Sequence, residues 1–174
     1  MTAAPRTLEG VDGLRLDAAA PDDAEAVLRV FADDPDVVRY VAWRPRTTHD
    51  QAERFLTVLR DDWRQDRWFW FARRDGEVAG GIIAAREGDE VEVSYVVARD
   101  AWGQGVATAM VNLVCSWALA ALPIRCVRAC ADAENLASRR VLEKAGFSLV
   151  AELPAFGVHN ISPAPRDCVR YERR

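Results

Sequence analysis

Residues 91–108 constrain the fold more than any other part of this sequence. A β-rich stretch over 91–98 leads into a short turn that contains Gly103 and Gly105, and a long apolar segment follows. Glycines between a strand and a helix let backbone N–H groups converge at the positive end of the helix, with no Cβ atoms in the way. Because such converging N–H groups bind phosphate, the sequence predicts a strand–turn–helix unit with an anion-binding turn.

Three strands are expected up to this turn, each joined to the next by a hairpin. Trp and Phe alternate over residues 67–73, so the two kinds of ring face opposite sides of a strand. The Asp-Gly pair at 75–76 is typical of a two-residue hairpin turn, and a second strand follows over 77–85. The Gly-Asp pair at 88–89 turns the chain again, into the strand over 91–98. These three strands are therefore predicted to be antiparallel.

The first third of the chain is expected to hold a short strand and several helices. Alternating leucines predict the strand at 14–16. Pro21 and the two aspartates after it are typical of a helix start. A short helix is expected at 37–41, and residues 48–51 match a capping box before an amphipathic helix. Residues 1–10 are expected to form a loose N-terminus.

Helices and strands alternate in the second half. The predicted elements are helices over 104–122 and 133–145, and strands over 124–130, 147–153 and 167–172. The crossover rule makes the strand over 124–130 parallel to the one over 91–98. Pro and Gly residues predict a loop between the last two strands. The expected fold is α+β: one domain over residues 1–174, with a mixed sheet of six to seven strands, flanking helices and one βαβ crossover.

Composition and charge narrow the classes of partner. Half of the 174 residues are hydrophobic and 29% are charged, as in ordinary globular proteins. A net charge of −4 argues against a nucleic-acid partner, because such surfaces are basic. No apolar run approaches the ~20 residues of a membrane span, and no leader opens the chain. We therefore expect a cytoplasmic protein with no membrane partner.

The cysteines do not indicate a metal site. Cys115, Cys126, Cys130 and Cys168 match no close zinc-binding spacing. We expect free, mostly buried thiols and no bound metal.

Three phosphate-binding arrangements place glycines after a strand. A P-loop is excluded, because no Gly-Lys-Ser/Thr follows the turn. A dinucleotide-binding fold is disfavoured, because Thr108 takes the place of the third glycine and the preceding strands are linked by hairpins. The third arrangement is the acyl-coenzyme A motif Arg/Gln-x-x-Gly-x-Gly/Ala. Residues 102–107, Trp-Gly-Gln-Gly-Val-Ala, occupy its frame, with Trp102 where Arg or Gln is usual.

A second motif follows in the right order. Residues 135–147 read Asn-Leu-Ala-Ser-Arg-Arg-Val-Leu-Glu-Lys-Ala-Gly-Phe, which is similar to an Asn-x-x-Ala/Ser helix closed by Gly-Phe. With both motifs, the chain from 14 to 171 resembles the GNAT superfamily of N-acetyltransferases. Trp-Gly-x-Gly-x-Ala is familiar in the branch of ribosomal-protein-alanine N-acetyltransferases, which the sequence resembles. The resemblance implies acetyl-CoA as co-substrate and direct transfer of its acetyl group to an amine in a ternary complex.

The resemblance also implies which residues bind coenzyme A. They are Val96, Val97, Ala98, Trp102, Gly103, Gln104, Gly105, Val106, Ala107, Thr108 and Asn135. The glycine turn would take the pyrophosphate, and the strand end over 96–98 would pair with the pantetheine arm. The Val97 N–H would donate to the thioester oxygen, and Asn135 would reach the arm or its thioester end.

Two residues are candidates for proton transfer. Glu92, in the strand before the turn, is the candidate base that takes the amine proton through water, with a solvated strand glutamate as the alternative and Glu90 as the fallback. Many relatives carry a tyrosine seven residues after the Asn, where this chain has Leu142. Ser138 matches a serine proposed as the acid in the alanine-acetylating branch; the alternative is a helix serine bonded to its own backbone.

The acceptor is less constrained than the donor. Trp43 is a candidate wall of the acceptor site, and Arg44 a candidate contact for a peptide carboxylate or an acidic acceptor. The acceptor amine could belong to a protein N-terminus or to a small molecule, and a homodimer stays open. The alternative function is an acyl-CoA-binding sensor or scaffold without turnover. Acetylation of charged tRNA is a third possibility, which the acidic composition disfavours.

Overall fold

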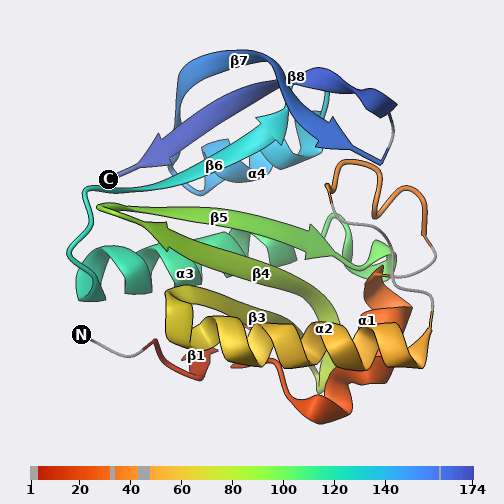
Figure 1. Cartoon of the computed structure of the whole chain (residues 1–174). Coiled ribbons are helices and arrows are strands. Elements are labelled where there is room, and N and C mark those ends of the chain that lie inside the picture. Colours follow the sequence, from red (N-terminus) through yellow and green to blue (C-terminus); the bar gives the residue numbers. More distant parts are fainter. Residues whose placement is uncertain (1–3, 32–33, 43–47, 161) are drawn as a thin grey trace.

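A mixed eight-stranded sheet forms the centre of the molecule. The computed structural model describes residues 4–31, 34–42, 48–160 and 162–174, apart from the side chains of Phe31 and Arg64. The strands are β1 (Thr7–Glu9), β2 (Leu14–Ala18), β3 (Arg67–Arg74), β4 (Glu77–Glu87), β5 (Glu90–Val97), β6 (Cys126–Asp132), β7 (Ser148–His159) and β8 (Ser162–Arg173), in the spatial order β1-β2-β3-β4-β5-β6-β8-β7. The α-helices are α1 (Ala24–Phe31), α2 (His49–Asp62), α3 (Val106–Ala121) and α4 (Leu136–Lys144). Helices α1 and α2 lie on one face of the sheet, and α3 and α4 on the other (Figure 1).

The predicted α+β class is confirmed, with one difference in the sheet. Strands β5 and β6 are parallel and α3 connects them, as the βαβ crossover requires. The sheet has eight strands where six to seven were expected. The extra strand is β1, a three-residue strand that pairs with β2 inside the segment predicted to be loose. So short a strand carries too little alternation to be recognised from sequence.

The predicted hairpins and their packing are present. Asp75 and Gly76 join β3 to β4 with φ values of +52° and +86°, the left-handed conformation that a two-residue hairpin turn needs. Trp68 and Trp70 of β3 pack edge-on against Trp117 of α3, with centroids 5.0 and 5.4 Å apart. On the opposite face, Phe69 packs edge-on against Phe55 of α2, and Phe71 packs against Phe69. Alternation along β3 therefore fills the core on both sides of the sheet.

The first two helix starts lie where the sequence predicts them, whereas α3 and α4 begin two and three residues later than the predicted 104 and 133. A short 3-10 turn, η1 (Pro21–Asp23), precedes α1, and Asp23 accepts a hydrogen bond from the Ala20 N–H at 2.8 Å. Thr48 caps α2 and accepts from the Gln51 N–H at 3.4 Å. No helix in the described ranges is long and apolar enough to cross a lipid bilayer.

The predicted helix over 37–41 is wrong, because the chain forms consecutive turns there. The Val38 N–H donates to the Asp34 carbonyl oxygen at 3.1 Å, and the Asp34 carboxylate accepts from the Asp36 N–H at 2.9 Å. The Val41 N–H instead donates to the Val38 carbonyl oxygen, three residues back, at 3.4 Å, so the bond between residues four apart is not continued as a helix requires. The segment therefore stays a compact loop beside the C-terminal hairpin.

The predicted loop before the last strand is also wrong. Strands β7 and β8 form a long hairpin, whose pairing shifts register at three places. These irregularities accommodate Pro154 and Gly157, which sequence reasoning assigned to a loop. A Cβ on Gly157 would lie 2.6 Å from Sγ of Cys168, so the glycine lets the two strands approach closely.

Strands β5 and β6 separate part-way along their length, which creates a fork in the sheet. Their pairing runs only from Glu90 opposite Cys126 to Glu92 opposite Arg128. Beyond Arg128, β6 continues along β8 to Asp132, while β5 stays paired with β4 as far as Val97. The two strands diverge towards the C-terminal end of β5 (Figure 1). The fork places residues 93–97 of β5 beside a gap in the sheet.

Candidate active site

The glycine turn lies between β5 and α3. A 3-10 turn, η3 (Arg99–Ala101), comes first, and α3 begins at Val106 with Gly105 as its N-cap. Gly103 and Gly105 have φ values of +74° and +78°, and a Cβ on either would meet no atom within 4 Å. The glycines are therefore needed for their backbone conformation, and the surface above them is open. The first N–H groups of α3 have no partner within the helix, and no acidic residue lies in its first turn.

Trp102 links the turn to the end of β5. Its indole Nε1–H donates to the Val97 carbonyl oxygen at 2.9 Å, and the Arg99 guanidinium lies 4.9 Å from the ring centroid. Gln104 donates to the Asp100 carbonyl at 2.7 Å, which closes the turn on itself. These contacts give Trp102 and Gln104 a structural part in holding the turn, beside their predicted part in binding.

The other residues predicted in the turn differ in the solvent exposure of their side chains. Val106 is buried in the core, so only its backbone faces the turn, while Ala107 and Thr108 are half-buried. Arg74 of β3, which sequence reasoning missed, donates from Nη1 to the Gln104 side-chain oxygen at 3.3 Å. A strand residue so distant in sequence carries no local signal of this contact.

The end of β5 directs alternate backbone groups to its two sides. The Ala98 N–H donates to the Ala79 carbonyl oxygen of β4 at 2.8 Å. Because this direction alternates along an antiparallel strand, Val96 also faces β4, whereas Tyr95 and Val97 face the fork. Three residues were predicted to pair with the pantetheine arm. Of these, only Val97 directs its backbone N–H and C=O groups towards the gap, whereas those of Val96 and Ala98 face β4.

Gly80 of β4 allows this part of the sheet to close up. It lies opposite Val97, and a Cβ on Gly80 would come 2.5 Å from the Val96 carbonyl oxygen. A side chain there would push β4 away from the strand end that borders the fork. Sequence reasoning missed this role, because an isolated glycine in a strand does not indicate which neighbour approaches it.

The first turn of α4 lies across the fork from β5. Asn135 caps α4, and its side-chain oxygen accepts from the Ser138 N–H at 3.1 Å. Its carbonyl-type oxygen therefore holds the helix start, a use that the sequence did not predict. The Ser138 hydroxyl lies 2.8 Å from the hydroxyl of Tyr95, and the Leu142 side chain, one turn later, is fully buried.

Tyr95 is the principal residue of the fork that sequence reasoning missed. Its hydroxyl also lies 3.2 Å from the Ser138 carbonyl oxygen, so β5 and α4 meet at this side chain. Burial raises the pKa of the Tyr95 phenol to about 12, and the hydrogen bond with Ser138 offsets part of that rise. The phenol is neutral at ordinary pH. In the sequence Tyr95 reads as one more inward-facing residue of an apolar strand.

Glu92 lies at the closed end of the fork, on the face opposite Tyr95. Arg128 donates to it from Nε at 2.9 Å and to Glu90 from Nη1 at 2.6 Å, and it also contacts Glu87. The Glu92 side chain is 40% exposed, compared with 14% for Glu90. Glu92 is therefore a solvent-accessible carboxylate held in place by an arginine, and the fallback residue Glu90 is less accessible.

A group that could hold a metal ion lies at the same end of β6. Ligand atoms of Glu90, Cys126 and Glu172 come within 4.8 Å of one another. Arginines engage the carboxylates, since Arg125 contacts Glu90 and lies 4.0 Å from Glu172. Burial, followed by the nearby Glu172, raises the pKa of the Cys126 thiol, which disfavours the thiolate that metals bind. The absence of a metal stays a prediction.

The predicted acceptor residues Trp43 and Arg44 lie outside the described residues. The segment before them, residues 34–42, meets the tip of the β7–β8 hairpin. Asn160 donates from its side chain to the Val38 carbonyl at 3.1 Å and from its backbone to the Val41 carbonyl at 3.1 Å. This junction, residues 34–42 with 159–160, is called the hairpin junction below.

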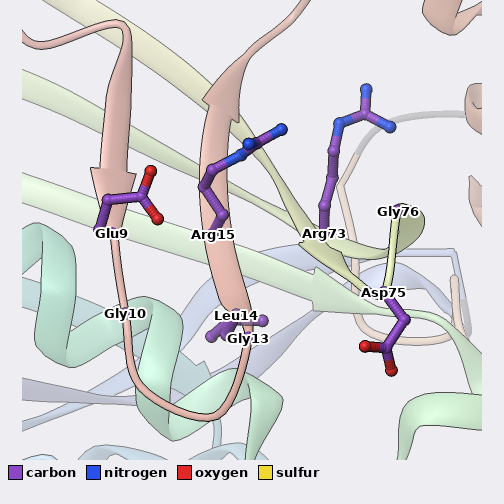
Figure 2. Close-up of a pocket in the computed structure, with 8 residues that line it drawn as sticks. All are labelled: Glu9, Gly10, Gly13, Leu14, Arg15, Arg73, Asp75 and Gly76. Carbon is purple, nitrogen blue, oxygen red and sulfur yellow. The ribbon is translucent and has the colours of Figure 1, made fainter.

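A cavity of about 330 Å³ lies elsewhere, between the β1–β2 turn and the β3–β4 hairpin. Figure 2 shows Arg15 and Arg73 extending to the same side of it, while Asp75 points the other way. Arg15 is paired with Asp17 at 2.7 Å, and Arg73 with Asp23. None of the predicted site residues lines this cavity, and its arginines are already neutralised.

Comparison with known proteins identifies the family. A family model described as an acetyltransferase (GNAT) domain matches residues 14–148. The uncharacterized N-acetyltransferase YoaA of Bacillus subtilis (strain 168) is 28% identical over 159 residues, which are 87% of this chain and 89% of that protein.

Solved structures share the fold. Mycobacterium smegmatis RimJ in complex with CoA-disulfide has a TM-score of 0.88 at 22% identity, over 98% of this chain and 88% of that one. The microcin C7 self-immunity acetyltransferase MccE, in complex with acetyl-CoA and AMP, has a TM-score of 0.85 at 15% identity, over 98% and 97% of the two chains. The family model spans the fork, the glycine turn and the first turn of α4. This chain belongs to the GNAT family of acetyltransferases and is an acetyl-CoA-dependent enzyme.

Proposed function

We propose that this protein transfers the acetyl group of acetyl-CoA to a primary amine by direct attack in a ternary complex. The observation that carries the proposal is the fork between β5 and β6. It has a carboxylate, Glu92, at its closed end and the Ser138 hydroxyl across its gap, and the glycine turn follows at the end of β5. Glu92 and Tyr95 are separated by about 10 Å along the strand, at ~3.3 Å per residue. Because these two side chains lie on opposite faces of the sheet, a donor bound at the glycine turn would reach both by placing its thioester in the fork.

The glycine turn fits a pyrophosphate. Gly103 and Gly105 hold the left-handed conformation and leave the surface open, so the N–H groups at the start of α3 can converge on an anion. The Val97 N–H faces the fork by strand alternation and would donate to the thioester oxygen. When bound, acetyl-CoA supplies the activated acetyl group. The chain's own residues bind and orient it and receive the amine proton.

The reaction needs a neutral amine and a base for its proton. The amine nitrogen forms the new bond to the acetyl carbon, the carbon–sulfur bond breaks, and its electron pair goes to sulfur. Glu92 takes the proton that the nitrogen loses, directly or through one water. Arg128 engages Oε2 of Glu92, which fixes the carboxylate at the fork. A carboxylate at this position also attracts a cationic amine to the site.

The acceptor is proposed to be a protein N-terminal α-amine or a small-molecule amine. RimJ, RimL and MccE share the fold. RimL is described as a ribosomal L7/L12 alpha-N-protein acetyltransferase, which supports a protein N-terminus, and MccE is described as a microcin C7 self-immunity acetyltransferase. Trp43 and Arg44 remain the proposed acceptor contacts, and the hairpin junction lies beside them in sequence. A homodimer and a cytoplasmic location remain part of the proposal.

A thiol-release assay tests the function. Acetyl-CoA is incubated with the protein and a panel of N-terminal peptides and small amines, and each peptide is paired with an N-terminally blocked copy. We expect release of free coenzyme A with at least one free amine and none with its blocked partner. Tight acetyl-CoA binding without release on any acceptor would favour the sensor or scaffold alternative. Release with charged tRNA alone would favour the third possibility.

A further inference from the structure

The hydroxyl groups of Tyr95 and Ser138 connect β5 to the first turn of α4 across the fork. Their oxygens lie 2.8 Å apart, and the Tyr95 oxygen lies 3.2 Å from the Ser138 carbonyl oxygen. Two arrangements of the hydrogens satisfy these distances. Tyr95 can donate to the carbonyl while Ser138 donates to Tyr95, or Tyr95 can donate to Ser138 Oγ. The second arrangement leaves the Ser138 hydrogen free for a group that enters the fork.

The backbone that carries the Ser138 hydroxyl is anchored as well. Asn135 accepts from the Ser138 N–H at 3.1 Å, which anchors the first turn of α4. A hydroxyl that accepts from Tyr95 and donates onwards forms a chain of two hydrogen bonds, in which each bond polarises the next. Breaking the thioester produces a thiolate, and hydrogen bonds to an ionised acceptor are stronger than those between neutral groups.

We propose that Tyr95 is a positioning residue that turns the Ser138 hydroxyl towards the coenzyme A sulfur, so that the thiolate leaves as an anion stabilised by a hydrogen bond. The inference rests on the proposed function for its place in the reaction. In this proposal Ser138 donates a hydrogen bond to the leaving sulfur and does not protonate it, unlike the acid expected from the sequence. The bond that breaks is the carbon–sulfur bond, its electron pair stays on sulfur, and the amine proton goes to Glu92.

The pKa of the Tyr95 phenol supports a role as hydrogen-bond donor and opposes a role as the acid that protonates the leaving sulfur. Burial raises the pKa of Tyr95 to about 12, whereas an ordinary thiol has a pKa of about 8.5. The phenol therefore holds its proton more strongly than the departing sulfur would. Tyr95 can stabilise the thiolate through Ser138 but does not protonate it.

The phenol hydroxyl beside Ser138 comes from β5 and not from α4. Ser138 and Leu142 are four residues apart and share one face of α4. The Leu142 side chain is fully buried and carries no hydroxyl, so α4 itself supplies no phenol on this face. In this protein Tyr95 brings a phenol hydroxyl to the same helix face from the neighbouring strand.

The thiol of bound coenzyme A gives a test that needs no acceptor. Its ultraviolet thiolate absorbance is titrated with pH in the complex, and the same complex with S-methyl-coenzyme A, which has no titratable thiol, is subtracted. Burial raises the pKa of all four cysteine thiols of the chain, so these titrate at higher pH than an ordinary thiol. We expect the bound thiol to titrate about one pH unit below free coenzyme A, the size of one hydrogen bond to a charged group.

Three variants separate positioning from general structure. Ser138→Ala should return the titration to that of free coenzyme A, and Tyr95→Phe should move it about halfway. Tyr95→Phe in the Ser138→Ala background should cause no further shift. Tyr171→Phe is the matched control, because its hydroxyl also donates to a residue of α4, Glu143, at 3.0 Å but at the far end of the helix. It should leave the titration unchanged.

Kinetics supply the second measurement. Tyr95→Phe should lower kcat severalfold and leave the KM for acetyl-CoA unchanged, because the hydrogen bond strengthens only as charge develops on sulfur. An unshifted thiol in the wild type, or equal effects of Tyr95→Phe with and without Ser138, would overturn the proposal. A shifted thiol in a protein that acetylates no amine would leave this inference standing and refute the proposed function.

Discussion

The proposed donor side and the proposed acceptor side of this molecule are built in different ways. On the donor side, the turn over residues 99–105 is held by contacts between near neighbours, such as Trp102 to Val97 and Gln104 to Asp100. On the proposed acceptor side, the hairpin junction joins Asn160 to Val38, 122 residues away. A site made by local backbone conformation leaves a motif in the sequence, whereas one made by distant segments does not. The donor can therefore be inferred from sequence, and the acceptor has to be found by experiment.

The largest effect is expected where the donor side depends on a backbone conformation. Gly105 holds φ +78° at the N-cap of α3, and β-branched residues rarely adopt this conformation. Gly105→Val should turn the N–H groups of the turn away and weaken coenzyme A binding on the order of 100-fold, since each factor of ten corresponds to ~1.4 kcal/mol. Calorimetry with coenzyme A measures the change.

Gly88 supplies the matched control for that substitution. It holds φ +64° in the β4–β5 turn, and a Cβ there would also meet no atom within 4 Å. Gly88→Val should lose a similar free energy of unfolding and bind coenzyme A normally. Normal affinity in the Gly105→Val variant would mean that the turn does not bind the pyrophosphate. The donor site could then not be inferred from the local sequence motif.

The next largest effect is expected at Glu92, the proposed base between the donor and acceptor sides. Glu92→Gln keeps an oxygen that can accept from Arg128 but removes the base, so kcat should fall about 100-fold while coenzyme A affinity stays the same. Glu87→Gln is the control, because Glu87 contacts the same guanidinium from a more exposed position. Equal, small losses in both variants would assign Glu92 to the ion-pair network alone, and an unaltered rate–pH profile would remove its role as base.

The same contrast explains which features of the fold were predictable. Gly103, Gly105 and the Asp-Gly turn at 75–76 were predicted, because their conformations depend on local residue types. Tyr95 was missed, because its partner lies 43 residues away and a strand of alternating residues gives the phenol no special mark. Strand β7 was cut short at Pro154, because bulges in a long hairpin tolerate residues that normally indicate a loop.

A smaller effect tests the acceptor side. Asn160→Ala removes the side-chain hydrogen bond to Val38 and should loosen the hairpin junction. One such bond contributes ~1 kcal/mol, so the KM for the acceptor should rise about fivefold with coenzyme A affinity unchanged. Asn112→Ala is the control, since Asn112 bonds Arg173 at 2.7 Å between α3 and β8. A change in coenzyme A affinity instead would show that the hairpin junction serves the donor.

The smallest effect distinguishes the two parts given to Trp102, support of the turn and contact with the donor. Trp102→Phe keeps a ring beside Arg99 but removes the indole N–H that donates to Val97 at 2.9 Å. Because this bond is exposed to water, about 0.5 kcal/mol is lost, and coenzyme A should bind two- to threefold more weakly. Trp63→Phe is matched, since Arg6 lies 4.5 Å from that ring, and it should leave the affinity unchanged. A loss well above tenfold would mean that the indole contacts coenzyme A itself, and the turn would then depend on a side chain as much as on its glycines.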